Sequence, residues 1–507
     1  MKSFIAIAGA ACFTLILCAQ TTFTGRWLVE ISNPDGQHRD ITLFLKQNGE
    51  TLSGAILMNY RMQDIADGKV TGDEASRAVV TRAGGQERRA EYHAKLAGSE
   101  LHVSMPRIGN RPASDVVAKK ISNDPTPVHP FASLPKPELP AIHPLLDNGL
   151  ARTPPMGWNS WNKFRGEVSD QVVREIADAM VSSGMKDAGY VYVNIDDTWE
   201  GSRDANGNIQ TNKKFPDMKA LADYVHGKGL KLGIYSSPGP RTCAGYEGSY
   251  AHELQDAKTW AAWGIDYLKY DWCSAAQVMK PIDMQAAYQK MGEALRAAGR
   301  PIVYSLCQYG LEHVETWGPA VGGNLWRTTG DIQDNWRSMS GIGFDKQTEL
   351  EKYAAPGHWN DPDMLEIGNG GMTDAEYRTH MSLWSILAAP LLAGNDIRSM
   401  SQATREILEN REVIAINQDK AGHQGARVAK DGDKEVWARA LAGGDWAVGL
   451  FNRGESAATV AANWSDLKLK GKHKVRDLWA HKDRGPMEDQ FSAEVPAHGV
   501  VLVRISK

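Results

Sequence analysis

The stretch YVYVNIDD, residues 190–197, decides the fold class of this 507-residue chain. It is a short run of β-branched and aromatic residues that ends in two aspartates. Such a run is typical of a strand that is buried on both faces of a parallel sheet. Runs of the same kind follow at residues 230–235, 267–270 and 301–306. We therefore expect a parallel β-sheet.

Helical patterns separate these strands. After Ser169, a good helix-capping residue, one predicted helix face carries Val172, Val173, Ile176 and Met180. A second helix is predicted to begin at Pro216, because proline is favoured at the first position of a helix. Strands and helices alternate about every 35 residues, so roughly eight βα units fit between residues 151 and 415. The sequence thus predicts a (β/α)8 TIM barrel, an α/β fold.

The segments that flank this barrel have the pattern of antiparallel β-structure. Between residues 20 and 120, runs with a period of two alternate with turn clusters such as residues 33–36, which predicts a small all-β barrel or sandwich. Prolines recur over residues 121–145, as in a stiff linker. We expect the catalytic barrel over residues 146–418 and an antiparallel β-sandwich over residues 419–507. The N-terminal β domain contains no chemical motif, and the sequence predicts no role for it.

The first residues have the layout of a secretory signal peptide. Lys2, an apolar run over residues 4–17 and then Cys18-Ala19 predict a leader over residues 1–19 and a secreted or periplasmic protein. A lipid anchor at Cys18 is the less favoured alternative, because Leu17 is bulky for such a processing site. The apolar run is too short for a stable membrane span, and no later stretch is long enough.

Charge and cysteine content narrow the possible partners and the redox setting. The net charge of -4 and the pI near 6.4 argue against a nucleic-acid partner, which requires a basic surface. Removal of the leader leaves Cys243, Cys273 and Cys307, which predicts one disulfide and one buried thiol in an oxidising compartment. The sequence makes no prediction about the oligomeric state.

Polar and aromatic residues gather at the C-terminal ends of the predicted strands. They are Trp158, Asp196, Asp197, Tyr235, Lys269, Asp271, Gln308, Arg327, Asp331, Asp361 and Asp363. In a (β/α)8 barrel these ends converge on one face, where active sites form. Clustered aspartates can hold a divalent cation, but no His or Glu recurs at ligand spacing, and a lysine and an arginine stand among the acids. We expect no metal and no cofactor.

Two of these carboxylates suit hydrolysis of a glycosidic bond. Asp271 and Asp331 follow the fourth and sixth predicted strands, where one can attack the anomeric carbon while the other protonates the leaving oxygen. Lys269 lies two residues before Asp271 on the same strand, so both side chains point the same way and the positive charge is expected to keep Asp271 ionised. We expect the Asp331 carboxyl to be partly desolvated, because a group that alternates between acid and base needs a raised pKa. Taken singly, each aspartate could equally be a helix cap or a solvated loop residue.

Five blocks of sequence resemble the signature blocks of glycoside hydrolase family 27, the α-galactosidase and α-N-acetylgalactosaminidase family. They are TPPMGWNSW (153–161), NIDD (194–197), YLKYD (267–271), WRTTGDI (326–332) and GHWNDPDM (357–364). The resemblance runs from about Leu146 to Lys507 and does not cover residues 20–145. It implies a retaining, metal-free exo-hydrolase, an α-galactosidase (EC 3.2.1.22), that acts on a carbohydrate with a terminal α-linked galactose.

The same resemblance implies roles for individual residues. Asp271 matches the nucleophile and Asp331 the acid/base, and Cys243 and Cys273 match a disulfide at the rim of the pocket. Sugar-binding positions are matched by Trp158, Asp196, Asp197, Tyr235, Lys269, Arg327 and Asp363.

The chain departs from the family pattern after Cys307. Gln308 stands where galactosidases of the family carry Glu, and we expect its side chain to hold the sugar's 2-hydroxyl. Because the N-acetylgalactosaminidases have small residues there, Gln308 argues against an acetamido sugar. The intact Asp196 and Asp197 argue against a β-L-arabinopyranosidase. Both glycones remain the alternatives to galactose.

Overall fold

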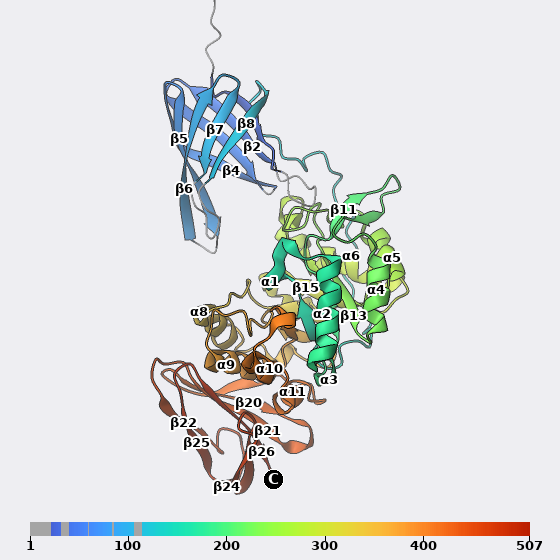
Figure 1. Cartoon of the computed structure of the whole chain (residues 1–507), viewed down its shortest axis with the longest axis vertical. Helices are drawn as coiled ribbons and strands as arrows, with labels where there is room; N and C mark the ends of the chain where they lie inside the picture. The colour runs from blue at the N-terminus through green and yellow to red at the C-terminus, as the bar shows by residue number, and fades with distance from the viewer. Residues whose placement is uncertain (1–21, 32–39, 59, 84–85, 106–113) are drawn as a thin grey trace, which may run out of the picture. The chain divides into compact units, whose positions relative to one another are not determined.

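The structure, a computed structural model, describes residues 22–31, 40–58, 60–83, 86–105 and 114–507. The predicted leader and the predicted turn at residues 33–36 lie outside these ranges. The chain forms two compact units, Met1–Ala132 and Ser133–Lys507, whose described parts are drawn in Figure 1.

The first unit is a closed antiparallel barrel. Its strands are β1 (Gly25–Val29), β2 (Ile41–Asn48), β3 (Thr51–Met58), β4 (Arg61–Thr71), β5 (Glu74–Ala83), β6 (Gln86–Ala97), β7 (Glu100–Met105) and β8 (Ser114–Ser122). Each strand pairs with the next, and β1 pairs with β8 to close the barrel. Buried and partly exposed residues alternate along β1, as a barrel with one packed face requires. The sequence predicted either a barrel or a sandwich, and the structure shows a barrel.

The second unit begins with a parallel barrel. Its strands are β9 (Met156–Asn159), β10 (Tyr192–Asn194), β13 (Lys231–Ser236), β14 (Tyr267–Asp271), β15 (Val303–Cys307), β16 (Leu325–Arg327), β17 (Trp359–Asp361) and β18 (Leu391–Ala393). They pair in parallel in the order β17-β16-β15-β14-β13-β10-β9-β18. Leu365 then joins the two ends, because its N–H donates to Leu392 O at 2.8 Å and its carbonyl accepts from Gly394 N at 2.9 Å. The predicted (β/α)8 fold is confirmed.

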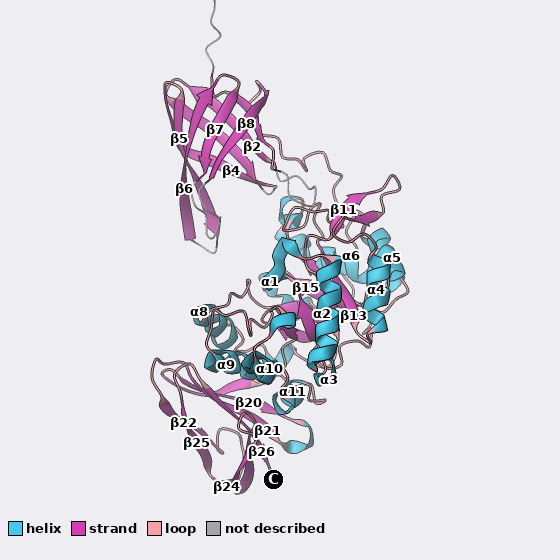
Figure 2. Cartoon of the chain, viewed as in Figure 1, coloured by secondary structure: helices cyan, strands magenta, loops and turns pink. Residues whose placement is uncertain are grey.

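Helices surround these strands, as Figure 2 shows. They are α1 (Trp161–Phe164), α2 (Asp170–Ser183), α3 (Met185–Ala188), α4 (Met218–Gly227), α5 (Glu253–Trp263), α6 (Met284–Ala297), α7 (Val314–Trp317), α8 (Trp336–Ser340), α9 (Asp374–Ile386), α10 (Gln402–Leu408) and α11 (Arg411–Asn417). The side chain of Ser169 caps α2 as expected, accepting from Val172 N at 3.4 Å. The predicted start at Pro216 is wrong, because Asp217 caps α4 by accepting from Ala220 N at 2.9 Å and the helix begins at Met218. A short hairpin, β11 (Glu200–Arg203) and β12 (Ile209–Thr211), follows β10.

Antiparallel β-structure completes the second unit. Its strands are β19 (Ala426–Asp431), β20 (Lys434–Ala440), β21 (Trp446–Asn452), β22 (Ala458–Asn463), β23 (Lys472–Asp477), β24 (Lys482–Glu488), β25 (Gln490–Val495) and β26 (Val500–Ser506). Six of them form one sheet, and β22 and β25 form a second. Trp437, Phe451 and Leu502 belong to the same buried cluster as the helices of the parallel barrel. The predicted C-terminal β-sandwich therefore packs directly on that barrel.

The proline-rich segment is held by the second unit over part of its length. Tyr250 donates to Pro135 O at 2.6 Å, and Leu145 N donates to Ala320 O at 2.7 Å. These bonds bind much of the expected linker to the parallel barrel. Among the described residues, no helix combines the length and the apolar character that crossing a bilayer requires.

Candidate active site

Asp271 is the last residue of β14, and its carboxylate is buried at the mouth of the parallel barrel. Its side chain is 5% exposed, and Tyr235 on the neighbouring β13 donates to its Oδ2 at 3.0 Å. Burial raises the pKa of Asp271 to about 6, while the nearby positive charge of Lys269 and the hydroxyl of Tyr309 act in the opposite direction. Oδ1 is buried and has no hydrogen-bond partner in the described part of the chain. One carboxylate oxygen is thus held in place and the other is left free.

Lys269 binds a different carboxylate from the one expected. Its Nζ lies 2.8 Å from Asp196 Oδ2, which also accepts from Asn159 Nδ2 at 2.8 Å. The expectation that Lys269 favours the ionised form of Asp271 holds in direction, but burial outweighs its effect on the pKa. Lys269 therefore acts on Asp271 through the field of a buried ion pair.

Asp197 follows Asp196 and points a second carboxylate into the site. Its Oδ2 accepts from Ala244 N at 2.6 Å, whereas Oδ1 is buried without a partner among the described residues. Burial raises the pKa of Asp197 to about 7. A buried acceptor without a hydrogen bond is unfavourable in free energy, so this oxygen is well suited to accept a hydrogen bond from a hydroxyl group of a polar ligand.

Arg327 lies at the end of β16 and contacts two aspartates. One is Asp363, and the other is Asp331 in the loop that follows β16. Its Nη2 lies 2.8 Å from Asp363 Oδ2 and 3.3 Å from Asp331 Oδ1. Asp363 has a φ of 91°, a strained conformation for this residue type, and its Oδ2 also accepts from Ile332 N at 2.9 Å. The arginine and Asp363 are both buried, and together they fix the loop at the position of Asp331.

The expected desolvation of Asp331 is not found. Its side chain is 68% exposed, because it follows Gly330 in a loop at the surface and no described residue covers it. A cavity of about 570 Å³ lies beside it. This cavity is lined by Tyr309, Thr328, Thr329, Gly330, Asp331, Ser338, Gly341, Ile342, Asp345 and Lys346.

Gln308 does not present its amide to this site. The side chain is fully buried, and its Oε1 accepts from the backbone N–H groups of Gly310 and Leu311 at 2.6 and 3.1 Å. Its Nε2 donates to Arg327 O at 3.3 Å. These contacts assign Gln308 to supporting the loop after β15, and they leave little capacity for a sugar hydroxyl. The expected role of Gln308 as a sugar ligand stays a prediction.

Trp158 is also more enclosed than a sugar platform would be. The ring is fully buried, its Nε1 donates to Asn395 O at 2.8 Å, and Phe164 packs edge-on at 5.9 Å. The N–H is therefore already paired. Its sugar-binding role stays a prediction.

Tyr309 is a residue of the site that the sequence interpretation missed. Its hydroxyl lies 3.5 Å from Cys243 Sγ and close enough to Asp271 to lower the carboxyl's pKa. Its φ is 64°, so the backbone is strained where this ring enters the site. The available signal was an aromatic residue directly after a strand end and before Gly310.

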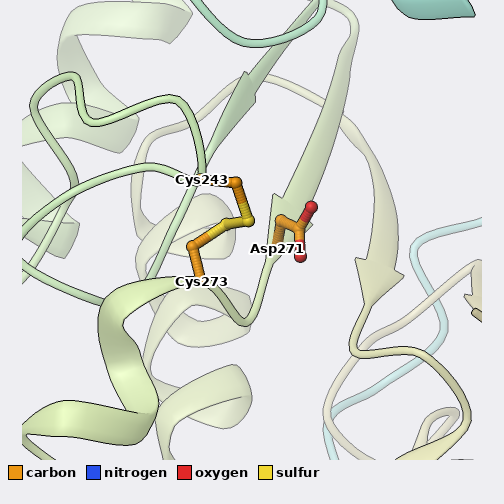
Figure 3. A group of neighbouring side chains, drawn as sticks. All are labelled: Cys243, Asp271 and Cys273. Carbon is orange, nitrogen blue, oxygen red and sulfur yellow. A yellow bond between two sulfur atoms is a disulfide. The ribbon is translucent and has the colours of Figure 1, made fainter. Parts of the chain in front are cut away.

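A disulfide lies next to the buried carboxylate, as Figure 3 shows. Cys243 and Cys273 are joined with a Cα–Cα distance of 4.8 Å, and Cys307 is a buried free thiol. The predicted pairing is confirmed. In the described ranges Cys243, Asp271 and Cys273 form a cluster of possible metal ligands, but sulfurs joined in a disulfide are not thiolate ligands.

Sequence profiles of known families match most of the second unit. Residues 153–419 match the family described as "Alpha galactosidase A", and residues 431–505 match "Alpha galactosidase C-terminal beta sandwich domain". The α-galactosidase of Cyamopsis tetragonoloba is 52% identical over 360 residues, which are 70% of this chain and 86% of that protein.

Solved structures agree with these matches. An α-galactosidase from Saccharomyces cerevisiae, solved with raffinose, superposes with a TM-score of 0.66 at 29% identity over 71% of this chain and 99% of that one. A Bacteroides fragilis protein of the α-galactosidase/melibiase type has a TM-score of 0.68 at 32% identity and covers 95% of this chain, with 92% of its own length matched. The chain belongs to the α-galactosidase family, glycoside hydrolase family 27.

Proposed function

We propose that Asp271 and Asp331 divide the chemistry of this α-galactosidase, which removes terminal α-linked galactose with retention of configuration. The observation that carries the proposal is the contrast between the two carboxylates. Asp271 is buried with one free oxygen, and Asp331 is exposed on the opposite loop beside a cavity. Retaining hydrolysis requires one carboxylate that attacks and one that exchanges protons with the leaving group.

In the first step Asp271 Oδ1 attacks the anomeric carbon of the bound galactose. The glycosidic C–O bond breaks as the Asp331 carboxyl protonates the leaving oxygen, and a covalent galactosyl ester forms on Asp271. Tyr235 holds Oδ2 at 3.0 Å, so Oδ1 is the oxygen available for attack. With a pKa of about 6, the Asp271 carboxyl is largely ionised at neutral pH.

In the second step Asp331 acts as the base. It removes a proton from water, the water oxygen attacks the anomeric carbon, and the Asp271 ester bond breaks to release galactose. Substrate bound over the exposed Asp331 shields this carboxyl from solvent. The proton is then exchanged with the leaving oxygen or the attacking water and not with bulk solvent.

The glycone side of the site is built from buried polar groups. The Asp196–Lys269 ion pair and the unpaired Asp197 Oδ1 offer acceptors and a donor to sugar hydroxyls, at the positions where the family binds O4 and O6. The cavity of about 570 Å³ that Asp331 helps to line is large enough to receive the leaving group. Galactosides are the substrate class, as the raffinose on the yeast relative indicates. The predicted leader supports a secreted or periplasmic enzyme.

The test compares azide rescue of two matched variants, Asp271→Gly and Asp331→Gly, with a 4-nitrophenyl α-galactoside. Without its nucleophile, Asp271→Gly should be inactive, and azide should restore turnover by attack from the vacated face to give the β-galactosyl azide. In Asp331→Gly, azide should attack the ester intermediate and give the α-galactosyl azide. If both variants gave the same anomer, the two assignments would be wrong.

The glycone is tested with three 4-nitrophenyl substrates. We expect the α-galactoside to be hydrolysed with the highest kcat/KM, ahead of the α-N-acetylgalactosaminide and the β-L-arabinopyranoside. A higher kcat/KM on either of the latter would replace galactose as the glycone without changing the roles of the two carboxylates.

A further inference from the structure

Two stretches of chain form most of the cavity beside Asp331. One is the loop after β16, residues 328–331, and the other is residues 338–346, which we call the cavity wall. The wall begins in α8 and continues through the π-helical turn Gly341–Asp345. Turns of this kind are rare and are frequent at functional sites, so the attachment of this one to the rest of the molecule matters for the cavity.

Aromatic side chains attach the cavity wall to the C-terminal β-sandwich. Phe344 is buried, and its ring packs against Trp437 of β20 at 6.1 Å and Phe451 of β21 at 5.2 Å. At the start of α8, Trp336 stacks on His498 of the sandwich with ring centroids 4.2 Å apart. The segment that forms the wall is therefore packed on the sandwich near its beginning and near its end.

Arg453 adds an ion pair to this attachment. It follows β21, and its Nη1 and Nη2 donate to Asp345 Oδ1 and Oδ2 at 2.8 and 3.0 Å. Two parallel bonds of this kind fix the orientation of a carboxylate as well as its position. Nη1 also donates to the buried Glu435 at 2.9 Å, which holds the guanidinium itself in place. The Asp345 side chain is still 47% exposed, so its oxygens can accept a further hydrogen bond from a ligand.

The polar groups of the cavity suit a leaving group that carries many hydroxyls. Asp345 offers acceptors, Lys346 offers donors, and Ser338 contributes a hydroxyl. Ile342 and Tyr309 add apolar surface. A sugar presents hydroxyls together with an apolar ring face, whereas a lipid chain would take the charged groups out of water without any hydrogen bond in return.

We propose that Arg453 is a positioning residue for a sugar leaving group. It holds the cavity wall so that Asp345 accepts a hydrogen bond from a hydroxyl of that sugar, and Arg453 itself does not touch the substrate. The C-terminal β-sandwich thus takes part in selecting the substrate, although the cavity lining comes from the parallel barrel. This inference rests on the proposed function, in which the cavity receives the leaving group.

The experiment compares raffinose with methyl α-galactoside, because both leaving groups need a proton from the acid. Methanol leaves the cavity nearly empty, whereas the sucrose released from raffinose occupies it. Arg453→Met keeps a long side chain and removes the two bonds to Asp345. It should lower kcat/KM for raffinose about five- to twentyfold, chiefly through a higher KM, and kcat/KM for methyl α-galactoside less than about twofold.

A second variant tests the same ion pair from the other side. Asp345→Asn changes a partly exposed side chain and keeps its shape, so it should fold as wild type does and show the same selective loss on raffinose. The double variant should lose no more than the larger of the two single losses, because both changes remove one interaction.

Arg476→Met is the matched control. Arg476 is also an arginine of the sandwich and donates to Glu412 of α11 at 2.6 and 2.9 Å, but neither residue lines the cavity. This control should keep the ratio of kcat/KM between raffinose and methyl α-galactoside. The inference is overturned if Arg453→Met leaves that ratio unchanged, or if Arg476→Met changes it as much. A wild-type enzyme that hydrolysed neither galactoside would overturn the proposed function, and this inference with it.

Discussion

The antiparallel barrel of residues 25–122 and the parallel barrel of residues 156–393 each contain eight strands. They differ in whether their buried cationic side chains have carboxylate partners. In the parallel barrel the buried Arg327 and Lys269 each have a carboxylate partner at 2.8 Å. In the antiparallel barrel the buried Arg77 has none among the described residues.

The difference follows from the geometry of the two barrels. Parallel strands end at one face, and polar residues from several strands meet there. In an up-and-down barrel, inward positions alternate with outward ones along each strand, so a single inward arginine has mostly apolar neighbours. Charge pairing is therefore built into the parallel barrel, whereas the buried arginine of the antiparallel barrel has no carboxylate partner among the described residues.

The largest loss of stability is expected when the buried ion pair between Arg327 and Asp363 is broken. Arg327→Met should lower the free energy of unfolding of the second unit by about 3–5 kcal/mol, because it leaves Asp363 buried and unpaired. Arg77→Met removes a charge that has no pair among the described residues, so the first unit should be as stable as wild type or more stable. Scanning calorimetry of both variants checks the comparison. Similar losses in both variants would contradict it.

Loss of the disulfide should have the next largest effect. Cys243 and Cys273 are 30 residues apart, and replacing both by Ser should destabilise the second unit by about 3–4 kcal/mol through the entropy of the unfolded chain. Urea denaturation followed by tryptophan fluorescence measures this change, and Cys307→Ala, which keeps the bridge, is the control. Equal midpoints for the double variant and wild type would show that the bridge contributes nothing.

Gln308→Ala distinguishes a scaffold residue from a sugar ligand. Because Gln308 accepts from two backbone N–H groups, the variant should lose about 1–2 kcal/mol of stability while the ratio of kcat/KM for the α-galactoside and the α-N-acetylgalactosaminide stays the same. If the acetamido sugar instead gained relative to the galactoside, Gln308 would face C2 of the substrate, as the sequence alone suggests.

The smallest effect is expected in the pH profile. Because the pKa of Asp271 is about 6, kcat/KM should fall on the acid side of about pH 6 as the nucleophile is protonated. Tyr309→Phe removes a hydroxyl that lowers this pKa, so the acid limb should move to higher pH, with a loss of about a fewfold near pH 5 and little change at pH 8. An acid limb that moved to lower pH would show that Tyr309 acts otherwise.

Much of the fold and of the site could be predicted from the sequence alone. Buried strands that alternate with amphipathic helices determine a parallel barrel, because local periodicity and chain connectivity leave few other arrangements. The convergence of Asp196, Lys269, Asp271, Arg327 and Asp363 follows from their positions at strand ends. The disulfide came with the family resemblance and was confirmed.

Other features were decided by the tertiary structure. Sequence spacing places a residue at a strand end, but the neighbours decide which atoms its side chain meets. Lys269 therefore pairs with Asp196 on another strand, Gln308 turns into the backbone, and Tyr309 approaches the nucleophile. The exposure of Asp331 depends on how the loop after β16 is held by Arg327. Burial also raises the pKa of Asp271 despite Lys269, because desolvation depends on everything packed around a group and not on its position along the chain.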